Sequence, residues 1–337
     1  MNHDQSSERR NVGAVSGVCA ALLLAPLQTV LADSFEMKLP IACEVGLTCF
    51  IQNYVDHDPS PNARDYRCGT LTYNGHNGTD FRLPNLAAQR AGVNVLAAAD
   101  GQVLRGRDGM PNVSTRDTNA PSVDGRECGN GVVIAHGDGW ETQYCHLDQG
   151  SVRMKAGDRV VAGQPIGRVG LSGRTEFPHL HLTVREAGKV VDPFAYGAPE
   201  GSCNSGRLLW KAANQESLTY RPRVVLNAGF ASGPVTMDQI ESGETGSISI
   251  EAPMIVSFVR AIGLKLDDTQ RLSIKGPNGQ ILAERTEKPL DSNKAQVMLF
   301  VGKRRPPEGW TPGTYEASYA VIEKGVVVLE RSIALSF

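Results

Sequence analysis

The chain has 337 residues, of which 41% are hydrophobic and 21% are charged, and its formal net charge is −2 at pH 7. This composition is ordinary for a soluble globular protein, and without a long Lys/Arg block it excludes electrostatic capture of nucleic acid or of an anionic membrane surface. The length exceeds what one hydrophobic core usually organises, and 36 glycines and 19 prolines indicate many turns, so we expect a leader and two β-rich units.

The amino terminus has the pattern of a secretory signal peptide, predicted to span 1–32. Arg9 and Arg10 precede an apolar run that ends in a cleavage-like sequence at Ala32. Pro26 and this cleavage site argue against a retained transmembrane helix, and no later stretch is apolar enough to span a bilayer. We therefore expect a mature chain without a membrane span, located in the periplasm or secreted.

Removal of the leader takes away Cys19 and leaves an even number of cysteines in an exported chain. Disulfides are therefore expected, and the short interval between Cys43 and Cys49 favours a local loop. Sequence alone does not choose among the other pairings, and no paired spacing typical of a metal knuckle is present. The six cysteines are Cys43, Cys49, Cys68, Cys128, Cys145 and Cys203.

An irregular lead-in at 33–66, with turn formers at 58–62, precedes a first domain at 67–196. Short β-like runs bounded by turn residues recur in this domain. Gly137 to Trp140 separates two of them, which predicts a hairpin that places His146 at a strand end. The predicted strands are 93–98, 101–104, 132–136, 141–146, 159–161, 166–169 and 180–185.

Residues 105–130 interrupt this rhythm with many glycines and prolines and no apolar period. They predict a long loop, which either borders a cleft as a lid or is a passive surface insertion.

A breaker-rich linker at 197–206 leads to a second domain at 207–337. Turn signals at Gly276 to Gly279 and at Lys324-Gly325 predict two hairpins there. The pattern favours an immunoglobulin-like β-sandwich, although it does not exclude a small barrel. The fold class is thus all-β, an antiparallel sheet domain followed by a sandwich. The predicted strands of the second domain are 223–226, 246–250, 255–261, 271–274, 280–283, 297–301, 315–322 and 326–335.

Three histidines and one aspartate form two compact groups. His76 and Asp80 are four residues apart, but the intervening Asn and Gly residues favour a loop or bulged strand end over a helix. His179 and His181 are two apart, so on a strand both side chains point to one face. Two imidazoles and a carboxylate suit a catalytic zinc that keeps a water ligand, and the remaining histidine of the pair and His146 could then move protons.

Each of these motifs alone is common by chance, and a surface loop or a structural histidine is the competing interpretation. Their combination within one β-rich domain favours a metal site. The residues themselves do not decide which of His179 and His181 binds the metal. His57 and His136 are assigned no chemical role.

The region from about Gly69 to Pro193 resembles the lysostaphin-like, or LytM-type, zinc metallopeptidases of family M23. Two departures concern the cleft wall: Glu176-Phe177 replaces the small residues usual before the Pro-His-x-His motif, and Leu182 stands where an aromatic is common. The motifs that carry the resemblance are His76-x-Gly78-x-Asp80-Phe81, Gly129-Asn130-Gly131, Tyr144-x-His146-Leu147, Gly157-Asp158 and Pro178-His179-Leu180-His181.

The resemblance implies His76, Asp80 and His181 as ligands of Zn²⁺, with His146 and His179 as catalytic histidines and no further cofactor. It implies a zinc endopeptidase that hydrolyses peptide bonds of peptidoglycan stems or cross-links. The alternatives are a non-catalytic activator of other wall hydrolases, or a module that binds the wall or an envelope protein through the carboxy-terminal domain. All five functional positions are present, which counts against the activator.

Overall fold

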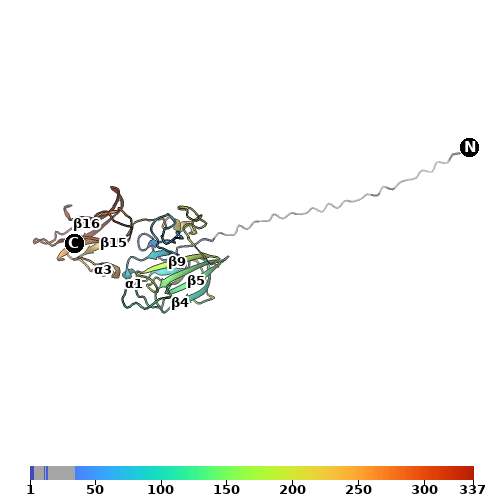
Figure 1. Cartoon of the computed structure of the whole chain (residues 1–337), viewed down its shortest axis with the longest axis horizontal. Coiled ribbons are helices and arrows are strands. Elements are labelled where there is room, and N and C mark those ends of the chain that lie inside the picture. The colour runs from blue at the N-terminus through green and yellow to red at the C-terminus, as the bar shows by residue number, and fades with distance from the viewer. Residues whose placement is uncertain (4–10, 12, 14–34) are drawn as a thin grey trace. The chain divides into compact units, whose positions relative to one another are not determined.

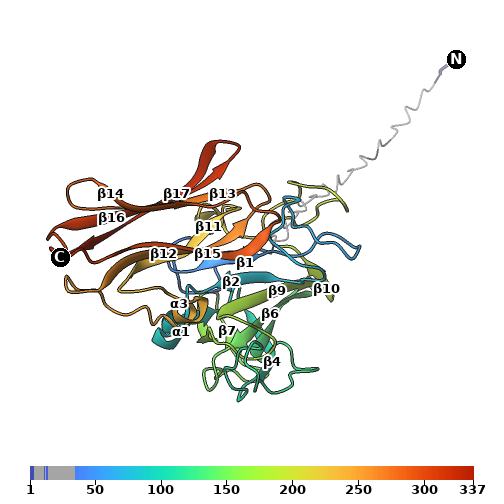
Figure 2. The same cartoon turned by 60° about the vertical axis from the view of Figure 1, so that its left-hand side comes forward.

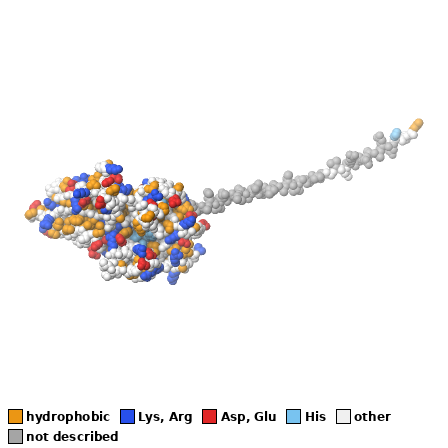
Figure 3. Space-filling model, viewed as in Figure 1, with side chains coloured by type: hydrophobic (Ala, Val, Ile, Leu, Met, Phe, Trp, Pro, Cys, Tyr) orange, Lys and Arg blue, Asp and Glu red, His pale blue; other side chains and the backbone are white. Residues whose placement is uncertain are grey.

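The computed structural model describes residues 1–3, 11, 13 and 35–337, and the predicted signal peptide lies almost wholly outside the described residues (Figure 1). The folded unit spans Phe35–Phe337. Within the part of the chain so described, no helix combines the length and the apolar character needed to cross a membrane. On the face seen in Figure 3, basic and acidic side chains are interspersed, in keeping with the small net charge.

The first sheet is antiparallel and has the strand order β1-β2-β9-β6-β5-β4-β7, with β10 beside β9. A small second sheet pairs β3 (Asn94–Leu96) with β8 (Pro165–Arg168), and the helix α1 spans Leu86–Ala91. The strands of the first sheet are β1 (Phe50–Asn53), β2 (Thr79–Arg82), β4 (Gly101–Arg107), β5 (Asn130–Gly137), β6 (Trp140–Leu147), β7 (Arg159–Val160), β9 (His179–Glu186) and β10 (Lys189–Val191).

All seven strands predicted for the first domain are present, whereas β1, β2 and β10 were not predicted. These three strands have three or four residues each, too few for an alternating pattern to stand out. The hairpin between β5 and β6 is confirmed: Asp138 and Gly139 lie between the paired residues Gly137 and Trp140, and both have positive φ, as a two-residue type I′ turn requires.

Alternation along β9 divides the first sheet into a core face and a site face. Leu180, Leu182 and Val184 are fully buried in the core, whereas His179 and His181 project from the opposite face. The core also takes in Met37 from the lead-in and Trp210 from beyond the linker. The core of the first domain therefore includes residues from the predicted lead-in and from the predicted second domain.

The second domain contains two sheets, β11-β12-β15 and β14-β13-β16-β17, which Figure 2 shows stacked on one another. Val259 of β12 and Leu272 of β13 share one buried cluster, so the sheets face each other across a common core. This confirms the sandwich. Its strands are β11 (Val224–Ala231), β12 (Met254–Leu264), β13 (Thr269–Lys275), β14 (Ile281–Thr286), β15 (Lys294–Arg304), β16 (Thr314–Glu323) and β17 (Val326–Ser336).

The strand predicted at 246–250 is wrong. Ile248 and Ile250 lie against the sandwich core, but the segment between α3 (Met237–Ser242) and β12 pairs with no strand. Two apolar residues spaced by two can contact a core without joining a ladder. The other helix of this region, α2, spans Ala212–Gln215. Both predicted hairpins are present, between β13 and β14 and between β16 and β17.

Three disulfides confirm the expectation from the cysteine count: Cys43–Cys49, Cys68–Cys203 and Cys128–Cys145. The first is the local loop that the short spacing favoured. The third joins the end of the long 105–130 loop to β6, one residue before His146.

Candidate metal centre

Five residues singled out in the sequence lie together on the site face of the first sheet. His76, Asp80 and His181 are buried and offer ligand atoms that all lie within 4.8 Å of one another. His76 Nε2 is 3.2 Å from Asp80 Oδ2, and His181 Nδ1 is 2.8 Å from Asp80 Oδ1. The rings of His146 and His179 lie beside this group, with centroids 4.6 Å apart.

Strand register brings the group together. Asp80 of β2 is paired with His181 of β9, and His181 is paired on its other side with Cys145 of β6. His76 lies on the turn that enters β2, and His146 follows Cys145. The sequence predicted a loop or a bulged strand end at Asp80; Asp80 lies within the strand β2, and the bulge is in the neighbouring strand β1, opposite Asp80.

Hydrogen bonds fix which imidazole nitrogens face Asp80. His76 Nδ1 donates to the Tyr54 carbonyl at 2.6 Å, so the neutral ring presents a lone pair at Nε2. His181 Nε2 lies 3.1 Å from both Asn77 Oδ1 and Thr183 Oγ1. Because these oxygens can accept a hydrogen bond, the ring proton is assigned to Nε2, and Nδ1 presents a lone pair. These two lone pairs are 3.2 Å apart beside a carboxylate.

Three acceptor atoms at such distances repel one another unless a cation lies between them. Burial, the largest influence, lowers the pKa of His76, but the Asp80 carboxylate outweighs it and the pKa is raised, so a proton satisfies the group when no metal does. A two-histidine, one-carboxylate donor set with its outer nitrogens hydrogen-bonded suits zinc.

Asp80 is kept as a carboxylate by its neighbours. Burial by itself raises its pKa, yet the imidazoles of His76, His179 and His181, when one of them is protonated, bring the pKa well below its usual value. Asn53 on β1 also donates to Asp80 Oδ2 at 2.9 Å. This oxygen is thus oriented from a strand that the sequence did not predict.

His146 and His179 form a second, uncharged pair. Their Nδ1 atoms contact the carbonyls of Ser172 and Phe177 at 2.8 and 3.0 Å, so each presents Nε2 to the site. Burial is the main cause that lowers the pKa of both rings, and for His146 the neighbouring His179 adds to it. His146 also has a φ of 62°, an uncommon conformation for a residue other than glycine.

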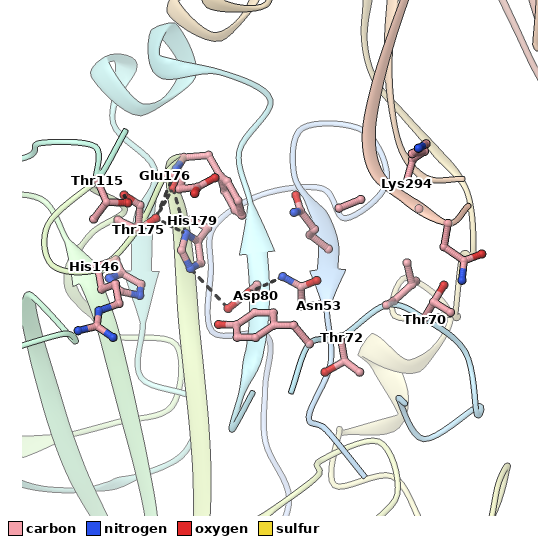
Figure 4. A pocket seen from close by; sticks show the side chains of 18 residues that line it. Asn53, Thr70, Thr72, Asp80, Thr115, His146, Thr175, Glu176, His179 and Lys294 are labelled. Atoms are coloured by element: carbon pink, nitrogen blue, oxygen red, sulfur yellow. Dashed lines mark hydrogen bonds and ion pairs between the residues drawn. The ribbon is translucent and has the colours of Figure 1, made fainter. Parts of the chain in front are cut away.

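The site opens into a cavity of about 560 Å³, and Asp80, His146 and His179 line it (Figure 4). Its walls come from both domains and from the long loop. In Figure 4, Lys294 of the sandwich lies across the cavity from His146. The other lining residues are Gln52, Asn53, Thr70, Leu71, Thr72, Tyr73, Thr115, Arg174, Thr175, Glu176, Phe177, Gly263, Asn293 and Ala295.

The two remaining histidines of the folded unit lie outside the group. His57 Nε2 contacts Asp192 Oδ2 at 2.8 Å, and His136 Nδ1 contacts the Asp100 carbonyl at 2.7 Å. Sequence reasoning missed Asn53 and the carbonyl groups that orient the imidazoles. Backbone carbonyls carry no residue signature, and Asn53 lies in a strand too short to recognise.

The part of the chain that contains this group is similar to known proteins. Residues 74–193 match the profile of peptidase family M23. The peptidoglycan DD-endopeptidase ShyA of Vibrio cholerae is 35% identical over 127 residues, which are 38% of this chain and 24% of that protein. The cell division protein DipM of Caulobacter vibrioides is 31% identical over 124 residues, 35% of this chain and 17% of that protein.

Among solved structures, a zinc-containing peptidase from Vibrio cholerae matches with 27% identity and a TM-score of 0.29, covering 44% of this chain and 41% of that one. The chain spans about a quarter or less of the length of the two curated relatives above.

Proposed function

We propose, on the premise that residues 74–193 form a domain of peptidase family M23, that this protein is a zinc endopeptidase acting on the peptides of bacterial peptidoglycan. The observation that carries the proposal is the set of three buried acceptor atoms, from His76, Asp80 and His181, which needs a cation. Peptidases of family M23 are zinc enzymes, and the donor set fits that metal.

His76 Nε2, an Asp80 oxygen and His181 Nδ1 would hold the zinc. When bound, zinc lowers the pKa of a water ligand from ~15.7 to about 7 and polarises a peptide carbonyl. The Tyr54 carbonyl and the Asn77 side chain keep the two ligand nitrogens unprotonated and aimed at the site. Asn53 holds the carboxylate from the other side.

His146 and His179 are the groups that would move protons. Because each Nδ1 is engaged by a carbonyl, the lone pair at Nε2 can accept a proton from water, and the imidazolium so formed can donate to an oxyanion or to the leaving amine. Their closeness disfavours two charges at once, so one protonated ring at a time is expected.

The substrate class is inferred from the shared domain. ShyA is described as a peptidoglycan DD-endopeptidase, and the family profile covers 74–193, a range that includes the site. Phe177 and Glu176 line the cavity in place of the smaller residues expected from the resemblance, so they should influence which peptide is accepted. Such a substrate lies outside the cytoplasm, the location that the predicted leader also favours. An envelope partner for the sandwich stays a prediction.

The direct test is digestion of purified peptidoglycan by the leader-free protein loaded with zinc. We expect new amines and products of smaller mass, loss of both after chelation, and recovery with zinc. His57→Ala is the matched control, because it removes a histidine that lies outside the site, and this variant should remain active. Intact peptidoglycan after prolonged incubation with zinc-loaded protein would contradict the enzyme and favour the activator.

A further inference from the structure

A second cavity, of about 360 Å³, lies in the first domain and is rich in arginine. It is bounded by β4, by β5 and by the last residues of the 105–130 loop. The residues of interest are Arg105, Arg107 and Arg126, together with Cys128, Val133 and Gln143.

Strand pairing places this cavity on the same face of the sheet as the metal group. From β9 to β4, side chains at directly paired positions share a face, and these positions connect the two sites. With strands ~4.8 Å apart and residues ~3.3 Å apart along a strand, His181 and Arg105 are about 15 Å apart, a span of roughly five extended peptide residues. The pairs are His181 with Cys145, Thr183 with Gln143, Gln143 with Val133, and Val133 with Arg105.

A disulfide connects the arginine cavity to the strand beside the metal group. Cys128 lines the arginine cavity, and its partner Cys145 is the cross-strand neighbour of His181. The sheet between the two sites is covered, because Thr183, Cys145 and Val133 are buried. A substrate that spans both sites therefore passes over the segments that cover β6 and β5.

The charge in this cavity is unbalanced. Its one lining carboxylate, Glu127, accepts from Gly125 N at 3.0 Å and is paired with Arg174 at 3.4 Å. The guanidinium of Arg107 is oriented by donation to the Gly129 carbonyl at 2.6 Å. Among the described residues, Arg105 has no hydrogen-bond or ion-pair partner for its side chain.

Arg185 adds to the positive charge on this face. It is paired with Glu141, two residues along β9 from Thr183, and its Nη1 is buried without a hydrogen-bond partner among the described residues. Burial lowers the pKa of Arg185; Glu141 opposes this, and the positive charge of Arg105 acts in the same direction as burial, so the two guanidinium groups repel each other. An anion held between such groups would relieve this repulsion, and a planar carboxylate matches guanidinium geometry.

We propose that Arg105, Arg107 and Arg126 form a subsite for a carboxylate of the peptide substrate, about four to five residues' reach from the scissile bond. The proposal rests on the proposed function for the identity of the substrate. It assigns to the ends of the long loop a role in recognition, distinct from the proton and metal chemistry at His181 and its neighbours.

The test compares two synthetic cross-linked stem peptides. In one peptide the carboxylates that are not part of peptide bonds are free, and in the other they are amidated. Arg105→Gln is the informative variant, because the Arg105 side chain is exposed and makes no hydrogen bond or ion pair among the described residues. We expect it to raise KM for the free-carboxylate peptide about 10-fold or more, with kcat and zinc content unchanged, since a charge-assisted hydrogen bond is lost. For the amidated peptide, wild type and variant should have the same KM.

Arg159→Gln, which removes an exposed arginine from β7 of the same sheet, is the matched control and should leave both peptides unaffected. Equal KM values of wild type and Arg105→Gln for the free-carboxylate peptide overturn the subsite while leaving the enzyme intact. If zinc-loaded wild type hydrolyses neither peptide, the proposed function fails. Direct titration then decides the subsite separately: tighter binding of the free-carboxylate peptide supports it, and equal Kd values reject it.

Discussion

Asp80 and Arg82 stand two residues apart on β2, on the same face, and each is the centre of a buried charged cluster. Asp80 is surrounded by imidazoles of the first domain. Arg82 instead contacts Glu241 of α3 at 3.0 Å, and the same Glu241 oxygen pairs with Arg260 of β12. Arg82 also donates to Gln52 at 2.6 Å. One strand thus carries the proposed metal group and the junction between the two domains.

The two clusters differ in how their charge can change. Imidazoles lose or gain a proton near neutral pH, so the Asp80 cluster can exchange a proton for a metal ion. Guanidinium groups do not: burial, the largest influence, lowers the pKa of Arg82 only to about 9, with Glu241 opposing it. The junction therefore depends on one carboxylate at all working pH values. Two positions on one face of a strand can thus serve one site whose charge changes and one whose charge does not.

The sharpest way to test the first cluster is to separate metal binding from turnover. We expect His181→Ala to lose zinc and to reduce hydrolysis to background, because one of three ligands is gone. His146→Ala and His179→Ala should keep zinc but lose about 10²-fold to 10⁴-fold in kcat, the usual range for a proton-transfer group. Metal analysis and peptide kinetics on the same preparations check this.

Retention of stoichiometric zinc by His181→Ala, with loss of zinc in His179→Ala, would reverse the roles within the pair. His136→Ala is a suitable histidine control, since its ring contacts Asp100 and Thr142 away from the cavity.

The junction cluster should be the weaker point for stability. Glu241→Ala leaves Arg82 and Arg260 buried without their shared carboxylate, and breaking a buried pair in this way costs about 3–5 kcal/mol in the free energy of unfolding. Urea denaturation of the zinc-loaded protein measures it. Glu244→Ala, an exposed acidic residue just beyond α3, should be within about 0.5 kcal/mol of wild type.

Comparable stability of the two variants would show that water solvates the arginines, and that the junction is not held by charge. Glu241→Gln should lie between them, because the amide oxygen still accepts a hydrogen bond.

A smaller effect is expected from the 105–130 loop, which belongs to neither cluster but lines the cavity beside Asp80 through Thr115. The loop is fastened to the wall beside His179, by Thr115 N to the Thr175 carbonyl at 2.9 Å and by Arg116 to Glu176 at 2.7 Å. Replacing 116–124 by a Gly-containing turn should modestly raise activity on intact wall, because large substrates need a wider cleft. Activity on a short peptide and the zinc content should not change.

Equal relative rates on wall and short peptide, in a shortened protein that folds and binds zinc, would identify the loop as a passive excursion.

The same contrast explains what the sequence could predict. The His76 to Asp80 spacing and the His179 to His181 spacing are local, so the pattern of residue types pointed to the metal group. The junction joins Arg82 to residues more than 150 positions away, and no periodicity links them. Arginine and glutamate there are indistinguishable from solvent-exposed charges until the fold is known.

Strand prediction succeeded and failed for related reasons. Long runs such as β9 and β16 were found because apolar residues alternate along them with other residues, as expected for a strand with one face in the core. The four-residue β2 is buried at every position, so alternation is absent from it. The 246–250 segment alternates but pairs with nothing, since a pattern of burial does not by itself require a partner strand.

The pairing of Asp80 with His181 also sets the order in which the centre can form. The two residues are 101 positions apart, so a chain that emerges from its amino terminus carries His76 and Asp80 long before their third partner arrives. Closing such a loop is a slow, late step in folding. High-affinity zinc uptake should therefore coincide with the docking of β9 between β2 and β6, which makes the metal a reporter of the completed sheet.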